Sequence, residues 1–157
     1  MNSGPKSIGE LLLGAIARYV TVRPEGLSVR PGEVVDSLAA RLLGFHAART
    51  LYEQRRPTCR SLDGVRAQTG GRTCAECVFR KRCTPQTCVD LWLDGLPARL
   101  MLAFTSLRNF LAFVEQRRKK GEPVEGANIL IAVRNRGHWG EVCFLADPST
   151  PKAPQSH

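Results

Sequence analysis

The chain has 157 residues and a mass of 17.3 kDa, a length that suits one domain and excludes two independent hydrophobic cores. Apolar residues make up 43% and charged residues 24%, which excludes an intrinsically disordered chain. The formal net charge of +9 favours a polyanionic partner, either a nucleic acid or an anionic membrane surface. Charge alone does not choose between function classes.

The two ends of the chain predict tails around a single domain. Residues 1–7 are polar, residues 148–157 contain three prolines, and we expect one β-rich domain over 8–147. The apolar run at 11–17 is too short to span a membrane, and no secretory signal is recognisable before it. We therefore expect a cytoplasmic protein in a reducing compartment, with no membrane partner.

The first third of the chain gives few unambiguous elements. Residues 9–22 are nearly continuously apolar and predict either a buried strand or a short helix. Two Pro–Gly signals predict turns over 23–32. Residues 33–52 have passable helical spacing, but Gly44 would cost about 1 kcal/mol in a helix, so we expect a strand from about Arg41.

The second half of the chain is easier to assign. Apolar and polar residues alternate over 89–93, which predicts a half-buried strand, with a turn at 95–97 and a hairpin partner at 99–104. A final hairpin should pair 128–134 with 141–146.

One amphipathic helix is predicted between these hairpins. Thr105 or Ser106 should cap its start, and Gly121 should follow its end. The buried stripe should consist of Leu107, Phe110, Leu111 and Val114. The fold class expected is α+β: a β-rich, OB-like barrel or sheet with this helix and an inserted zinc-ribbon-like segment at about 55–88.

That inserted segment holds five of the six cysteines and few apolar residues, so something other than hydrophobic burial must order it. A Cys-x2-Cys pair directs two thiolates at one point, and two further cysteines complete a tetrahedral zinc site. The predicted ligands are Cys59, Cys74, Cys77 and Cys83. Cys88 is the substitute for the fourth place, and an iron–sulfur cluster is the alternative to Zn²⁺. We expect Cys143 to pack in the last strand.

The positive charge is concentrated in two segments. Residues 53–82 hold eight basic against three acidic residues, and residues 108–136 hold seven against three. Lys and Arg at such density neutralise phosphates, and exposed aromatic rings stack on bases. The candidate nucleic-acid-binding residues are thirteen of the fifteen cations of these segments and two tryptophans: Arg55, Arg56, Arg60, Arg72, Arg80, Lys81, Arg82, Arg117, Arg118, Lys119, Lys120, Arg134, Arg136, Trp92 and Trp139.

Catalysis finds little support in the sequence. There is no Gly-rich phosphate loop, no His-Glu-x-x-His pair, and no His-x-Glu motif of a zinc deaminase. We therefore predict that the protein is not an enzyme.

The segments 57–64 (PTCRSLDG) and 71–77 (GRTCAEC) resemble a motif of small phage and mobile-element proteins, Cys-Arg-Ser-x-Asp-Gly followed by a Gly-rich Cys-x2-Cys knuckle. The resemblance covers roughly residues 40–146. The family looks like zinc-containing, single-stranded DNA-binding or replication accessory proteins, loosely similar to the zinc-bearing binding proteins of T-even phages. This chain departs from it in Val78, where a proline is usual, in a short loop from Cys77 to Cys83, and in the extra Cys88.

The function expected from residues and resemblance together is non-enzymatic binding of single-stranded nucleic acid, with DNA as the expected partner, in replication or recombination. Two alternatives stay open. One is a zinc-stabilised protein–protein adaptor of a larger nucleoprotein complex, which would leave apolar surface exposed. The other is an iron–sulfur accessory of a nuclease.

Overall fold

The computed structural model describes residues 18–61 and 73–147. The predicted tails at 1–7 and 148–157, and all but the last residues of the apolar segment 9–22, lie outside these ranges. In chain order the elements are β1 (Arg18–Tyr19), β2 (Thr21–Arg23), β3 (Gly26–Ser28), β4 (Ser37–Glu53), β5 (Arg56–Ser61), η1 (Cys74–Glu76), η2 (Arg80–Arg82), β6 (Thr84–Leu93), β7 (Leu96–Leu102), α2 (Phe104–Lys119), β8 (Asn128–Asn135) and β9 (Gly140–Ala146).

Seven strands form one mixed sheet in the order β1-β7-β6-β4-β8-β9, with β5 also paired to β4, and β2 and β3 form a separate hairpin. β1 runs parallel to β7 and the other pairs are antiparallel. Within the described residues the large sheet ends at β1 and at β9 and does not close into a barrel. The β-rich α+β class is therefore confirmed. No helix in these ranges has the length and apolar character needed to cross a membrane.

β4 is the longest strand and joins the parts of the sheet. It pairs with β6 along most of its length, while β8 pairs with its beginning and β5 with its end. The strand begins at Ser37, four residues before the expected start near Arg41. The register to β6 shifts between Leu42 and Gly44, so the glycine that argued against a helix lies at a β-bulge.

The hairpins follow the sequence pattern closely. In β6, Val89, Leu91 and Leu93 are buried in the core, as their alternation predicts. The turn to β7 is formed by Asp94 and Gly95, both with positive φ, so Leu96 and Pro97 belong to the strand and the predicted turn at 95–97 is wrong by one or two residues.

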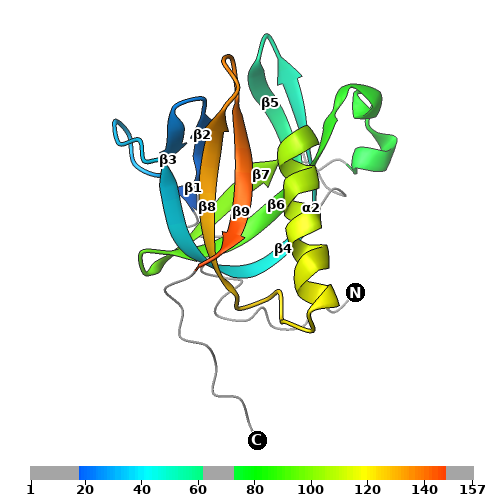
Figure 1. Cartoon of the computed structure of the whole chain (residues 1–157). Helices are drawn as coiled ribbons and strands as arrows, with labels where there is room; N and C mark the ends of the chain where they lie inside the picture. The colour runs from blue at the N-terminus through cyan, green and yellow to red at the C-terminus, as the bar shows by residue number, and fades with distance from the viewer. Residues whose placement is uncertain (1–17, 62–72, 148–157) are drawn as a thin grey trace, which may run out of the picture.

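Helix α2 lies against β9 at the edge of the sheet (Figure 1). It ends as predicted: Gly121 has φ +68°, its N–H bonds to the Arg118 carbonyl at 3.0 Å, and the Glu122 N–H bonds to the Arg117 carbonyl at 2.9 Å. These two bonds form a Schellman motif.

The start of α2 and part of its buried face differ from the prediction. The N-cap is Ala103, which has no hydroxyl, so neither Thr105 nor Ser106 caps the helix. Phe110 and Val114 are buried as expected, and Phe113 joins them. Leu111 is 49% exposed, because the helix turns its 106, 110, 113 and 114 positions toward the sheet.

Candidate metal and nucleic-acid site

The Cys-x2-Cys pair forms a single tight turn. The Cys77 N–H donates to the Cys74 carbonyl at 3.3 Å, and the Arg80 N–H donates to the Cys77 carbonyl at 3.1 Å. The two short helices η1 and η2 contact each other and have no buried residue. Backbone hydrogen bonds therefore shape the two turns, and neither short helix contributes a residue to an apolar core.

The other two predicted ligands reach the same place from the sheet. Cys83 follows η2, with its N–H directed at the Phe79 and Arg80 carbonyls (both 3.2 Å), and immediately precedes β6. Thr84 at the start of β6 pairs with Thr50 on β4, and Cys59 on β5 pairs with the adjacent Leu51. The end of β4 thus has Cys59 on one side and Cys83 on the other.

The pKa of Cys83 is influenced by the other three thiols. Burial raises the pKa of Cys83, the guanidinium of Arg49 opposes this rise, and the thiols of Cys77, Cys59 and Cys74 add to it. Negative charge on any of these three cysteines therefore disfavours negative charge on Cys83.

Two buried polar atoms near this cluster have no hydrogen-bond partner among the residues that the structure describes. They are Nε of Arg49 and Oγ1 of Thr73, which directly precedes Cys74. Arg49 also donates through Nη2 to the Arg80 carbonyl at 3.4 Å, which ties η2 to β4. Buried donors beside thiols suit a thiolate metal site, because metal-bound sulfur accepts hydrogen bonds from such groups.

The donor set thus fits zinc in type, number and surroundings. In residues 18–61 and 73–147, however, no group of three or more His, Cys, Asp or Glu side chains is already arranged around one point as metal ligands. Holding a metal would require the four sulfurs to draw together to about 2.3 Å from it.

Cys88 lies apart from this cluster. Its side chain is fully buried in β6, opposite His46 on β4, and its Sγ lies 3.8 Å from Oδ1 of Asp90. Burial, and then the charge of Asp90, raise the pKa of Cys88 to about 12, which disfavours the thiolate that a metal needs. Asp90 is also paired with His46 at 3.5 Å and with Arg99 at 3.6 Å. These placements favour Cys83 over Cys88 as the fourth ligand.

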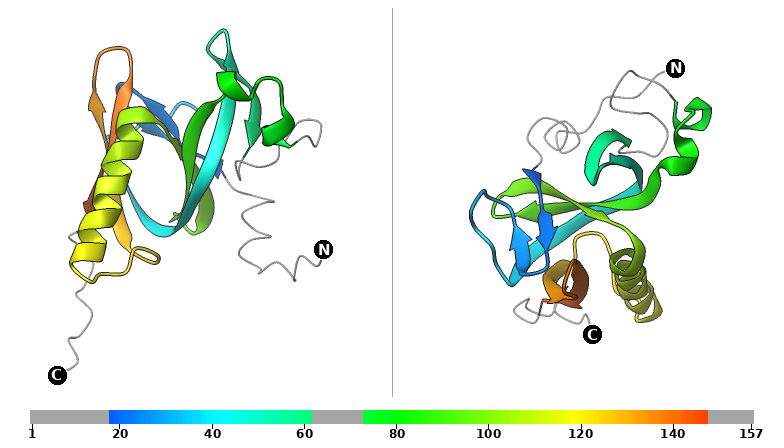
Figure 2. Two further views of the ribbon diagram at one scale, coloured as in Figure 1. Left: turned by 90° about the vertical axis from the view of Figure 1, so that its right-hand side faces the viewer. Right: turned by 90° about the horizontal axis from the view of Figure 1, so that it is seen from above.

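Among the described residues, the cations of the first basic segment have no ion pair with an acidic side chain. Arg55 is exposed in the turn between β4 and β5, Arg56 is exposed at the start of β5, and Arg80 and Lys81 are exposed on η2. This turn and η2 lie at the same end of the molecule (Figures 1 and 2).

Three further cations of that segment differ in setting. The Arg60 guanidinium lies 4.9 Å from the centroid of the Tyr19 ring, and that of Arg82 lies 5.7 Å from the Phe79 ring. Arg72 lies outside the described residues.

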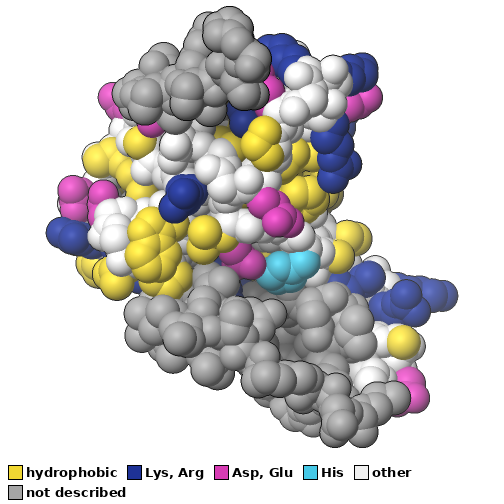
Figure 3. All heavy atoms as spheres, turned by 90° about the horizontal axis from the view of Figure 1, so that it is seen from below, with side chains coloured by type: hydrophobic (Ala, Val, Ile, Leu, Met, Phe, Trp, Pro, Cys, Tyr) yellow, Lys and Arg dark blue, Asp and Glu magenta, His cyan; other side chains and the backbone are white. Residues whose placement is uncertain are grey.

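The cations at the end of α2 form a separate group. In the view from below, the Lys and Arg side chains on one side of the molecule form two groups (Figure 3). One group lies over the end of α2, and the other lies farther from the viewer. Arg117 is largely buried and pairs with Glu122 at 3.1 Å, and Lys119 pairs with Glu115 at 3.3 Å. Only Arg118 and Lys120 of this run are exposed without a described acidic partner.

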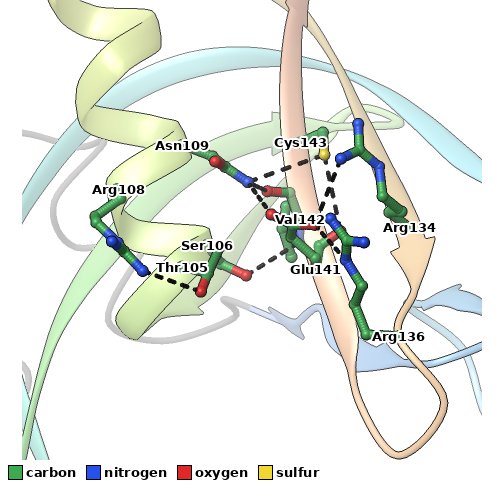
Figure 4. A network of polar contacts seen from close by, with 9 residues as sticks. All are labelled: Thr105, Ser106, Arg108, Asn109, Arg134, Arg136, Glu141, Val142 and Cys143. Atoms are coloured by element: carbon green, nitrogen blue, oxygen red, sulfur yellow. Dashed lines mark hydrogen bonds and ion pairs between the residues drawn. The ribbon is translucent and has the colours of Figure 1, made fainter.

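Arg134 and Arg136 both form ion pairs with Glu141, a residue that was not among the candidates predicted from the sequence. The Glu141 carboxylate is almost fully buried at the start of β9 and accepts hydrogen bonds from Asn109 (3.2 Å) and from Arg136 (2.8 Å), as Figure 4 shows. The Asn109 and Arg136 hydrogen bonds lower the pKa of Glu141, burial opposes them, and the charges of Arg136 and Arg134 add to the lowering. One indication of this contact was present in the sequence: the predicted hairpin brings the strand with Arg134 beside the strand with Glu141, and the structure pairs these two residues directly.

Cys143 lies in this network rather than near the other thiols. It is half-buried on β9, and Asn109 Nδ2 lies 3.9 Å from its Sγ (Figure 4). The expectation that it packs in the last strand is consistent with this position.

The two tryptophans are both exposed, Trp92 by 39% and Trp139 by 45%. Trp92 lies at the end of β6 opposite to Cys83, whereas Trp139 lies in the turn between β8 and β9. Trp139 has an arginine, Arg136, in the same turn, with the Arg136 N–H bonded to the Trp139 carbonyl at 3.0 Å, and Trp92 pairs across the strands with Arg41 on β4.

No family model, curated protein or solved structure matches this chain.

Proposed function

We propose that this protein binds single-stranded nucleic acid without catalysing a reaction on it, and that a zinc–thiolate centre formed by Cys59, Cys74, Cys77 and Cys83 orders part of the binding surface. The observation that carries the proposal is that Cys59 and Cys83 flank the end of β4, next to the Cys74–Cys77 turn and to exposed Arg80 and Lys81. A tetrathiolate zinc site would shape η1 and η2, and the cations would contact phosphates.

Charge pairing and position together support the choice of binding surface. Arg117, Lys119, Arg134 and Arg136 are paired with acidic side chains, whereas Arg55, Arg56, Arg80 and Lys81 have no described acidic partner. Arg118 and Lys120 have no described acidic partner either, but they lie at the end of α2, away from the cysteine segment. The cysteine segment and the β4–β5 turn can therefore release counterions from nucleic acid without first breaking an ion pair.

The experiment compares two double charge reversals in fluorescence anisotropy with single-stranded DNA at rising salt. Arg80→Glu/Lys81→Glu changes the proposed surface, and the matched control Arg118→Glu/Lys120→Glu makes the same change in net charge at the end of α2. We expect binding about tenfold weaker in the first variant, with a salt slope smaller by about 1.4, the value for two lost contacts on a single strand. The control should bind nearly as the parent does. Absence of binding by the parent at low salt, or equal losses in both variants, would contradict the proposal.

A second candidate function is the protein–protein adaptor, because large apolar side chains remain exposed. Val78, between the two short helices, is 82% exposed, and Leu145 on β9 is 57% exposed. An adaptor would co-purify with a partner and lose it on Val78→Ser, while binding DNA weakly in the anisotropy experiment.

A further inference from the structure

A cavity of about 410 Å³ opens between the start of α2 and the β8–β9 turn. The residues that line it are mostly apolar and include Val22, Met101, Val142, Phe104 and Trp139. The volume lies in the range of small-molecule sites, and such sites are mostly apolar with few polar groups.

Phe104 occupies an unfavourable conformation at this cavity. Its φ is +49°, a region that side chains other than Gly, Asn and Asp rarely adopt, and its ring is 77% exposed. Both the backbone strain and the exposure of an apolar ring are unfavourable, and no contact within the described chain is seen to offset them. Strained residues of this kind concentrate at binding sites, where a ligand supplies the missing contact.

Trp139 is held in place from several sides. A Cβ on the following residue, Gly140, would lie 2.4 Å from the Arg23 carbonyl oxygen, so only glycine allows β2 to pack here. The turn is closed by the Arg136 N–H bond to the Trp139 carbonyl and by the Gly137 N–H bond to Asn135 Oδ1 at 2.8 Å. The indole is thus presented by a rigid turn while staying 45% exposed.

The β8–β9 hairpin that carries Trp139 has a net positive charge. The guanidinium groups of Arg134 and Arg136 both contact the single carboxylate of Glu141, which leaves one positive charge in excess on this hairpin. Arg134 and Glu141 face a neighbouring hollow beside Asn109, whereas Gly140 and Val142, which alternate with Glu141 along β9, line the cavity itself. An aromatic ligand attached to an anion matches this combination of two exposed rings and surplus positive charge.

We propose that Phe104 and Trp139 receive one base of a bound single strand by stacking. The inference rests on the proposed function, since it takes the ligand to be the nucleic acid that the cysteine segment holds by its phosphates. Every base has a π-face, so the site would accept bases with little sequence preference. It extends the binding surface from the cysteine segment to the β8–β9 turn.

The test uses the full chain carrying Trp92→Phe, so that Trp139 is the one tryptophan, and two ligands of equal length, oligo-dT and an abasic deoxyribose-phosphate strand. We expect oligo-dT, but not the abasic strand, to quench Trp139 fluorescence. Phe104→Gly should bind oligo-dT about tenfold more weakly, in keeping with the loss of one stacked base, and should fold because glycine accepts φ +49°. Trp139→Phe, tested by anisotropy, should retain most of the affinity, whereas Trp139→Ala should not.

The outcomes separate the two proposals. If both strands bind equally well and Trp139 is not quenched, the base site is wrong and the proposed function stands. If Phe104→Gly keeps full affinity for oligo-dT, the base site is also wrong. If neither strand binds at low salt, the proposed function itself fails.

Discussion

Glu141 shows how one buried carboxylate organises the turn that carries Trp139. It lies at the start of β9, where Arg136 contacts it twice, through Nε at 2.8 Å and Nη2 at 2.7 Å, and Arg134 lies 3.7 Å away. Both Arg136 nitrogens contact the same oxygen, Oε2, and charge-assisted hydrogen bonds of this kind are stronger than neutral ones. The orientation of the β8–β9 turn therefore depends on an acidic residue that a search for cations and aromatic rings passes over.

Replacing Glu141 by Gln should lower the melting temperature at pH 7. Because the folded-state pKa of Glu141 is lowered, its contribution to stability is present above the ordinary glutamate pKa and is lost as the pH falls through the folded value. Thermal melts from pH 7 to pH 3 should show the difference between parent and variant shrinking as the pH falls. Glu115→Gln, at an exposed i,i+4 pair with Lys119, is the control and should change the melting temperature little. A difference that stays constant over this pH range would contradict the prediction.

Cys88 should make the fold sensitive to alkali. Its folded pKa of about 12 exceeds the ordinary value of 9.0, so the stability it contributes is complete below pH 9 and declines as the pH rises toward 12. Between pH 8 and pH 10 the parent should lose about 1 kcal/mol of unfolding free energy that Cys88→Ala does not lose, as measured by urea denaturation at each pH. Cavity formation lowers the stability of the variant at both values, so the comparison depends only on the change with pH. Parallel losses in the two proteins would count against this role.

At the scale of elements, α2 completes the edge of the sheet. The Ser106 hydroxyl accepts the Val142 N–H at 3.0 Å, and Asn109 Nδ2 donates to the Val142 carbonyl at 2.9 Å. Both backbone groups of Val142 that point away from β8 are thus satisfied by helix side chains, which protects an edge strand from pairing with another chain.

Ser106→Ala should therefore destabilise the protein by about 1–3 kcal/mol, because it leaves a buried N–H without an acceptor. Asn109→Ala should have a similar effect, and the double variant should deviate from additivity since both side chains serve one residue. Thr105→Ala, in the same helical turn, removes only an exposed contact of 3.5 Å to Arg108 and should change the urea midpoint little. Equal midpoints for Ser106→Ala and Thr105→Ala would show that α2 does not protect the edge.

The contact between Ser106 of α2 and Val142 of β9 shows why some elements could be predicted from the sequence and others could not. The β8–β9 hairpin and the end of α2 at Gly121 follow from local patterns of alternation and turn chemistry, and both were predicted. The helix start was wrong because the role of Ser106 is decided by Val142, 36 residues later in the chain. Likewise, the Cys-x2-Cys turn is local, whereas the approach of Cys59 to it depends on the pairing of β4 with β5. Glu141 was not predicted because its structural importance comes from its burial next to two arginines, and burial cannot be seen in the composition.

At the scale of the whole molecule, the net charge of +9 divides into surfaces of different kinds. Much of the second basic segment is neutralised internally by Glu115, Glu122 and Glu141. The first segment keeps exposed cations next to the Cys74–Cys77 turn and Cys83. A zinc ion on four thiolates carries a formal charge of −2, which reduces the whole charge to about +7 without removing this basic surface.

Removing the metal should loosen one segment and leave the sheet folded. The buried core consists mainly of residues of the large sheet and α2, with Val20, Leu27 and Ala127 beside them, and η1 and η2 contribute no buried residue to it. Purified protein should contain about one zinc per chain by elemental analysis, and a brown protein with iron and sulfide would instead indicate a cluster.

Chelation should speed tryptic cleavage at Arg80–Arg82 and weaken DNA binding, while the far-ultraviolet circular dichroism and the main thermal transition change little. Cys77→Ser should reproduce these effects, and Cys143→Ser should bind zinc as the parent does, because Cys143 lies in the network with Asn109. Loss of the whole fold on chelation would mean that the metal supports the core, and a chain that binds no metal would contradict the thiolate site.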